Sequence, residues 1–76
     1  MENNLLERIT TNPKIMLGKP SIRGTRLTVE LILEKLAAGV SEEEILKSYP
    51  ILEKEDIRAC LLFASKSLSL SEILEV

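Results

Sequence analysis

The chain has 76 residues, a mass of 8.5 kDa and a formal net charge of −2, and 45% of its residues are hydrophobic. This length indicates one small domain, and a single cysteine with no histidine excludes an intrachain disulfide and argues against a zinc site. No apolar run approaches the ~20 residues that a membrane span needs, so we expect a cytoplasmic protein with no membrane contact. Because so small a core is marginal alone, we also expect association with another chain, as a homodimer.

The two signs of charge are unevenly distributed along the chain. Residues 8–28 contain five cations and no acid, whereas residues 36–76 contain eight acids and four cations. Such asymmetry is an electrostatic clue to function. We divide the single domain into four parts: a loose lead-in (1–8), a basic strand or hairpin arm (9–28), a three-helix core (29–67) and an apolar C-terminal tail (68–76).

Short strands are predicted in the basic arm. Residues 8–11 have β character and end at Asn12-Pro13, which is a strong turn signal. Residues 14–17 form a second short apolar stretch, and residues 25–29 alternate polar with apolar side chains and include β-branched ones. We therefore predict short strands or a hairpin before the first helix.

Two helices are predicted after this arm. From Val29 onwards, apolar residues recur at i, i+3, i+4, i+7 and i+8, which is the pattern of an amphipathic helix. Thr28 is its expected N-cap, and Gly39 stands where a left-handed C-terminal cap belongs. Residues 41–44, Ser-Glu-Glu-Glu, form a capping box that begins a second, short helix, and Pro50 ends it.

A third helix is predicted to begin near Glu53 or Lys54, because acidic residues there suit the positive end of a helix. The residues expected on its buried face are Ile57, Cys60, Leu61 and Ala64, with Leu62 and Phe63 beside them. Three helices joined by short turns are the layout of a helix-turn-helix domain, although any three-helix bundle shares this pattern. The predicted fold is therefore mainly α, with short N-terminal strands.

The stretch 18–26 reads Gly-Lys-Pro-Ser-Ile-Arg-Gly-Thr-Arg and combines turn residues with three cations. It is not a P-loop, because no lysine follows the second glycine, and it lacks the third glycine of a dinucleotide-binding fingerprint. The cations could be the solvated edge of a hairpin, they could bind the phosphates of DNA, or an arginine could neutralise the acidic site of a nuclease partner. The candidate DNA-binding residues here are Lys19, Arg23, Thr25 and Arg26.

In a helix-turn-helix protein the third helix reads bases, which adds Lys54 and Arg58 as DNA-binding candidates. This helix is only weakly basic and offers no Asn or Gln to read adenine, so we expect the arm to supply most phosphate contacts. The acids at 42–44 suit a helical first turn better than a metal site. No nucleophile with a base is recognisable, so we predict no catalytic, cofactor-binding or metal-binding residue and no enzyme.

The tail, residues 68–76, holds five apolar side chains in an alternating pattern that turns helical after Ser71. Such a segment either folds back onto its own domain or covers a partner and becomes ordered on binding. The candidate partner-binding residues are Leu68, Leu70, Ile73 and Leu74.

Several blocks keep a distinctive spacing: Gly18-Lys19-Pro20, then Ile-Arg-Gly-Thr-Arg at 22–26, Gly39 before Ser41, and Tyr49-Pro50. With the apolar positions between them, they resemble the family catalogued as domain of unknown function 433, over residues 8–64. The resemblance implies a homeodomain-like helix-turn-helix fold. It also implies an antitoxin of a bacterial type II toxin–antitoxin pair, which inhibits a PIN-like ribonuclease toxin and represses its own operon by binding operator DNA.

The sequence departs from the family pattern at three positions. Leu17 stands where many members have a second glycine, Glu53 replaces a commoner threonine, and Cys60 replaces alanine. Two alternatives to the antitoxin remain open at this point: a stand-alone helix-turn-helix regulator and a protein-interaction module without DNA binding. For the homodimer, strand exchange or edge pairing through residues 8–28 is one expected route.

Overall fold

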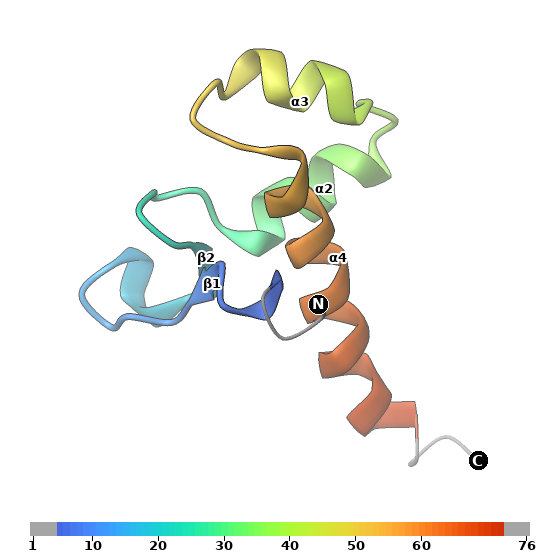
Figure 1. Cartoon of the computed structure of the whole chain (residues 1–76). Helices are drawn as coiled ribbons and strands as arrows, with labels where there is room; N and C mark the ends of the chain where they lie inside the picture. Colours follow the sequence, from blue (N-terminus) through green and yellow to red (C-terminus); the bar gives the residue numbers. More distant parts are fainter. Residues whose placement is uncertain (1–4, 73–76) are drawn as a thin grey trace.

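The structure is a computed structural model that describes residues 5–72 (Figure 1). It is mainly helical, with a short two-stranded antiparallel hairpin in front of the main helices. In chain order the elements are β1 (Ile9–Thr10), the 3₁₀ turn η1 (Met16–Gly18), β2 (Ser21–Ile22), α2 (Val29–Ala37), α3 (Glu42–Ser48) and α4 (Lys54–Glu72). Among the described residues, none of these helices combines the length and apolar character that crossing a bilayer requires.

The hairpin confirms strands in the arm, but they are shorter than predicted. Ile9 pairs with Ile22 and Thr10 with Ser21, and only an isolated bridge joins Ser21 to Thr28. The expectation of strand structure in the second apolar stretch, residues 14–17, was wrong. Met16 and Leu17 have φ angles of 51° and 58°, in the left-handed region that no strand uses.

The helix α2 begins and ends where the sequence predicts. The Thr28 hydroxyl oxygen accepts a hydrogen bond from the N–H of Leu31 at the N-terminus. At the C-terminus Gly39 has a φ of +92°, and the N–H of Val40 donates to the carbonyl of Lys35 over 3.0 Å. This left-handed glycine and this hydrogen bond are the features of a Schellman cap, which satisfies the last carbonyls of the helix and turns the chain towards α3.

The helix α3 carries the predicted capping box. The Ser41 hydroxyl accepts from the N–H of Glu44, and the Glu44 carboxylate accepts from the N–H of Ser41 over 3.1 Å. The helix ends at Ser48, two residues before Pro50. Its acidic first turn therefore has a structural role, as the sequence indicates.

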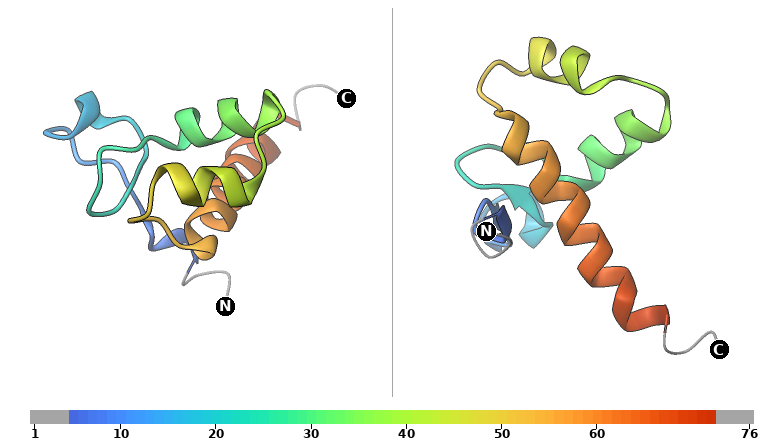
Figure 2. Two further views of the ribbon diagram at one scale, coloured as in Figure 1. Left: turned by 90° about the horizontal axis from the view of Figure 1, so that it is seen from above. Right: turned by 45° about the vertical axis from the view of Figure 1, so that its right-hand side comes forward.

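The helix α4 begins at Lys54 as predicted but continues to Glu72. The tail is therefore not a separate alternating segment over residues 68–72, because this part of the chain belongs to the helix. No glycine or proline follows Pro50, so nothing in the sequence interrupts the helix. Figure 2 shows the C-terminal half of α4 projecting beyond the other elements.

The core lies between α2, α3 and the first half of α4, and the hairpin packs against it beside α4 (Figures 1 and 2). Its buried side chains are mainly aliphatic: Ile22, Val29, Ile32, Ile45, Leu52, Ile57 and Cys60. The placement of Leu61 in the core was wrong, because this side chain is 46% exposed. The buried face of α4 is formed by Asp56, Ile57, Ala59 and Cys60, and at 100° per residue Leu61 lies beyond the edge of this face.

Candidate functional site

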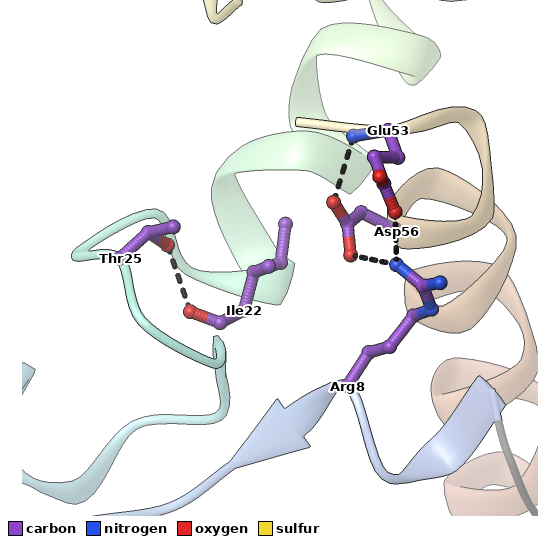
Figure 3. A network of polar contacts seen from close by, with 5 residues as sticks. All are labelled: Arg8, Ile22, Thr25, Glu53 and Asp56. Carbon is purple, nitrogen blue, oxygen red and sulfur yellow. Dashed lines mark hydrogen bonds and ion pairs between the residues drawn. The ribbon is translucent and has the colours of Figure 1, made fainter. Parts of the chain in front are cut away.

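The first cation of the basic arm, Arg8, has a structural role. Its Nη1 donates to the carboxylate of Glu53 over 2.9 Å and to that of Asp56 over 3.0 Å (Figure 3). These hydrogen bonds, with Glu53 contributing most, hold the pKa of Arg8 above its ordinary value. Arg8 therefore stays charged and joins β1 to the start of α4, which removes one cation from those available to a ligand.

Asp56 completes this connection from inside the protein. Its side chain is nearly buried, and its Oδ2 accepts the N–H of Glu53 over 2.8 Å while its Oδ1 accepts from Arg8. The N–H of Glu53 lies at the start of the helix, where it has no partner within the helix itself. One carboxylate thus caps α4 and binds the arm.

The turn between β2 and α2 presents two arginines. Gly24 has a φ of +82°. The Thr25 hydroxyl donates to the carbonyl of Ile22 over 2.8 Å (Figure 3) and accepts from the N–H of Leu27 over 3.0 Å. These bonds fix the backbone between Arg23 and Arg26, both of which are exposed. Among the described residues, no side chain forms an ion pair or hydrogen bond with either guanidinium group.

The hydroxyl of Thr25, a candidate DNA-binding residue, is therefore engaged inside the turn. Its structural part is to hold the two neighbouring arginines in place. Lys19 differs from them, because its Nζ lies 3.2 Å from the carboxylate of Glu30. Both groups are more than half exposed, and an ion pair of this kind stabilises a protein by less than about 1 kcal/mol. The lysine can therefore exchange this acid for another anion.

The structure brings Arg23 close to the start of α4. A polar hollow of about 300 Å³ is lined by Arg8, Arg23, Ile51, Glu53 and Asp56. Arg26 and Lys19 do not line it. Lys54 and Arg58 are exposed and four residues apart, so they share one face of α4. The candidate cations therefore divide between the turn and the helix, with acids at the hollow between them.

An apolar groove, which the sequence analysis did not find, lies between α2 and the C-terminal half of α4. Its volume is about 530 Å³, and its apolar walls include Pro20, Leu33, Ala37, Phe63, Ala64 and Leu68. The signal in the sequence was the breadth of the apolar stripe on α2. Leu33 and Ala37 belong to that stripe, but no element of the described structure covers them completely.

The groove includes one of the four predicted partner-binding residues. Leu68 lies on its wall and is 65% exposed. The side chain of Leu70, and Ile73 and Leu74 altogether, lie outside the described residues. The part of the predicted surface that the structure describes is therefore exposed and adjoins a further apolar surface.

The surroundings of the Cys60 thiol and of the Tyr49 ring indicate structural roles for both side chains. Burial raises the pKa of the Cys60 thiol to about 12, with a smaller contribution from the charge of Asp56. The half-buried Tyr49 ring has the Nζ of Lys35 at 5.9 Å from its centroid. Among the side chains that the structure describes, no group of three acidic or cysteine residues is arranged to hold a metal ion.

These features define a small, mainly helical domain with a hairpin, an exposed arginine turn and an apolar groove. The chain belongs to the family DUF433, described as proteins of unknown function, whose model matches residues 9–64. It is 40% identical over 58 residues to the uncharacterized protein y4eO of Sinorhizobium fredii. That alignment covers 76% of this chain but 26% of the relative, so the chain spans about a quarter of that protein's length.

A solved structure confirms the relationship at the level of the fold. The crystal structure of a DUF433 member protein from Anabaena variabilis superimposes with a TM-score of 0.79 at 26% sequence identity. The match covers 90% of this chain and 67% of that one. The arrangement of hairpin and helices described above is therefore that of a family with a known structure and an unknown function.

Proposed function

We propose that this protein is an antitoxin of a bacterial type II toxin–antitoxin pair. It acts in the cytoplasm, binds and inhibits a PIN-like ribonuclease toxin, and represses its own operon by binding operator DNA as a homodimer. The observation that carries the proposal is the presence of two different surfaces on one small domain. One surface is the turn with Arg23 and Arg26, and the other is the apolar groove that ends at Leu68.

The arginine turn supports the DNA-binding half of the proposal. Thr25 and Gly24 fix the backbone, so the two guanidinium groups extend from a rigid base. Arginines held in this way bind phosphate oxygens with little loss of backbone freedom. Lys19 adds a third cation once it leaves Glu30. In this proposal α3 and α4 form a homeodomain-like helix-turn-helix motif, in which Lys54 and Arg58 approach the duplex.

The groove supports the toxin-binding half of the proposal. Its walls are apolar, and its volume of about 530 Å³ is enough to accept the side chains of an amphipathic segment. Leu68 continues the apolar surface onto the projecting end of α4. A partner bound there would leave the turn at residues 23–26 accessible, because none of the groove residues belongs to that turn.

The first experiment is co-expression with the product of the adjacent gene, with an affinity tag on this chain alone and native mass spectrometry of the eluate. We expect a complex with a small protein whose expression alone arrests growth. Leu68→Ser should weaken the complex, whereas Leu17→Ser, which also removes an exposed leucine but lies outside the groove, should not. Recovery of this chain alone, beside a harmless neighbour, would contradict the antitoxin assignment and favour a stand-alone regulator.

One observation favours a different function. Glu53 and Glu55 flank Lys54 at the start of α4, where a helix-turn-helix protein approaches DNA. These acids repel phosphate and support a protein-interaction module without DNA binding. Retention of the chain on a DNA column at low salt, and its release as salt rises, separates the two functions.

A further inference from the structure

The two walls of the apolar groove differ in charge. On α2 the lining residues include two acids, Glu30 and Glu34, which are exposed and lie one helical turn apart on the same face. On α4 the lining residues that the structure describes carry no charge: they are Phe63, Ala64, Ser67 and Leu68. We call Glu30 and Glu34 the acidic rim of the groove.

The fold leaves both carboxylates of the acidic rim accessible. Among the described side chains, none forms an ion pair or hydrogen bond with the carboxylate of Glu34. The carboxylate of Glu30 pairs with Lys19 over 3.2 Å, but this ion pair is exposed and another cation can replace the lysine. The rim therefore offers two carboxylates to the cations of a ligand.

The walls of the groove restrict the kind of backbone that can enter it. An extended segment needs an unpaired strand edge to bond its N–H and C=O groups. The lining residues, all in the described part of the chain, include none from β1 or β2. A helix bonds its own backbone groups and presents only side chains to the walls. The groove therefore fits a helix better than a strand.

The shape of the groove suits large apolar side chains. The C-terminal ends of α2 and α4 diverge, so the space between the two helices opens outwards (Figures 1 and 2). Small residues at Ala37, Ala64 and Ser67 leave room on its walls, while the half-buried Leu33 and Phe63 pack against the core and supply apolar surface. Leucine, isoleucine or phenylalanine at i, i+3 or i+4, and i+7 of a helix would occupy this space.

We propose that the groove binds an amphipathic helix of the partner protein, whose apolar face enters between α2 and α4 and whose lysines or arginines pair with the acidic rim. Charge complementarity selects cations, and the spacing of the rim places them about one helical turn apart. This inference rests on the proposed function, because it names the feature of the partner that the groove recognises.

A second copy of this chain fits the groove less well. Among the described residues, the large apolar side chains that are exposed on an α-helix are Leu61 and Leu68, both on α4. Leu68 already belongs to the groove, which leaves Leu61 alone to enter the groove of another copy. One leucine does not make the apolar face of an amphipathic helix. The occupant is therefore a different protein.

Binding of this helix is compatible with binding of DNA. A cation of the partner that pairs with Glu30 replaces Lys19, which then becomes available to phosphate. The same exchange links the groove to the basic arm through a single exposed ion pair.

Fluorescence anisotropy of the full chain with two labelled helical peptides of about 15 residues tests the proposal. Both peptides carry leucine at i, i+3, i+4 and i+7, and the residues beside this face are lysine in one peptide and glutamate in the other. We expect the lysine peptide to bind at least about fivefold more tightly, with a smaller difference at high salt. Equal affinities, or no binding of either peptide, would overturn the proposal.

Matched variants locate the binding site. Glu34→Lys should abolish the preference for the lysine peptide, whereas Glu43→Lys, the same change at an exposed acid of α3, should preserve it. Leu68→Ser should weaken binding about tenfold, whereas Leu61→Ser, on the same helix but outside the groove, should not. Circular dichroism verifies that each variant is folded. If the control variants lose as much as the others, the peptide binds elsewhere and the proposal is wrong.

Two further outcomes separate this inference from the proposed function. The peptides contain no toxin sequence, so they report on the groove whatever the adjacent gene encodes. A toxin complex that withstands both Glu34→Lys and Leu68→Ser would leave the antitoxin function in place and exclude the groove as its binding site. A homodimer that Leu68→Ser dissociates and Leu61→Ser does not, in a chain that binds neither peptide, would show a second copy in the groove and contradict the proposal.

Discussion

Arg8 and Asp56, 48 residues apart in the chain, are joined by a 3.0 Å hydrogen bond between Nη1 and Oδ1. The bond connects the first strand of the hairpin to the first turn of α4. Backbone bonds continue this connection, because the carbonyl of Arg8 accepts the N–H of Arg23 over 2.7 Å. The position of the arginine turn therefore depends on a contact with the start of α4, a segment distant from the turn in the chain.

Asp56→Ala should lower the free energy of unfolding by about 2 kcal/mol, because it removes a helix cap and leaves the N–H of Glu53 without a partner. Asp56→Asn keeps an acceptor for that N–H and should lower the free energy of unfolding by about half as much. Urea denaturation measures both. Glu53→Gln is the control, since this exposed carboxylate should contribute less than about 0.5 kcal/mol. Equal losses for Asp56→Asn and Asp56→Ala would mean that the cap contributes nothing.

Replacing Arg23 and Arg26 together with alanine should weaken binding to operator DNA several-fold and reduce its salt slope by about one to two. The expectation follows from the exposure of both guanidinium groups on one rigid turn. Fluorescence anisotropy at a series of salt concentrations measures affinity and slope. Lys14→Ala with Lys47→Ala removes the same charge from exposed sites outside the turn. If this control pair lowers the slope equally, net charge rather than the turn determines binding.

Leu17→Gly should raise the free energy of unfolding by about 0.5–1 kcal/mol. Leu17 is 95% exposed and has a φ of 58°, so glycine loses no packing and relieves the cost of a left-handed conformation. Gly24→Ala is the reverse experiment. Gly24 has a φ of +82° and open space around it, so alanine there should lower the free energy of unfolding by about 1 kcal/mol. Thermal and urea unfolding compare the two variants, and a loss of stability in Leu17→Gly would contradict the geometry of this turn.

The protein should lose stability as pH rises from about 9 towards 12. The pKa of Cys60 is 9.0 ordinarily and about 12 in the fold, so above pH 9 the unfolded chain loses a proton that the folded chain keeps. The stability that this thiol provides is complete below pH 9 and disappears above it. Cys60→Ala should make the decline with pH shallower. Equal slopes for the variant and the native chain would show that other groups cause the decline.

The helix ends of α2 and α3 are predictable from sequence, because each depends on residues within a few positions of each other. Thr28 caps through the N–H of Leu31, and Ser41 and Glu44 cap each other. Gly39 has the positive φ that its place after α2 requires. In each case, the residue types that satisfy free backbone groups stand next to the groups themselves.

Other features depend on contacts between distant segments and escape such reasoning. Arg8 looks like one of five equivalent cations in the sequence, and only the packing of β1 against α4 gives it acidic partners. The apolar groove exists because the body of the domain ends before α4 does. Leu61 was misplaced because a helix rich in apolar residues does not show which of them the rest of the chain covers.

The difference between the two halves of α4 has a consequence for local opening. The side chains of Ile57, Ala59 and Cys60 are fully buried, so the amides of this part of the helix exchange hydrogen with solvent only when the whole domain unfolds. The helical residues from Ser65 to Ser69 are exposed, and the backbone hydrogen bonds there open by fraying without disturbing the core. The N-terminal half of α4 is thus strongly protected from hydrogen exchange, whereas its C-terminal end is weakly protected. A partner that binds the C-terminal end of α4 slows hydrogen exchange of the amides at that end selectively. The free energy of global unfolding, measured from the amides near Ile57 and Cys60, is the upper limit of this protection, and the end reaches it only in the bound state.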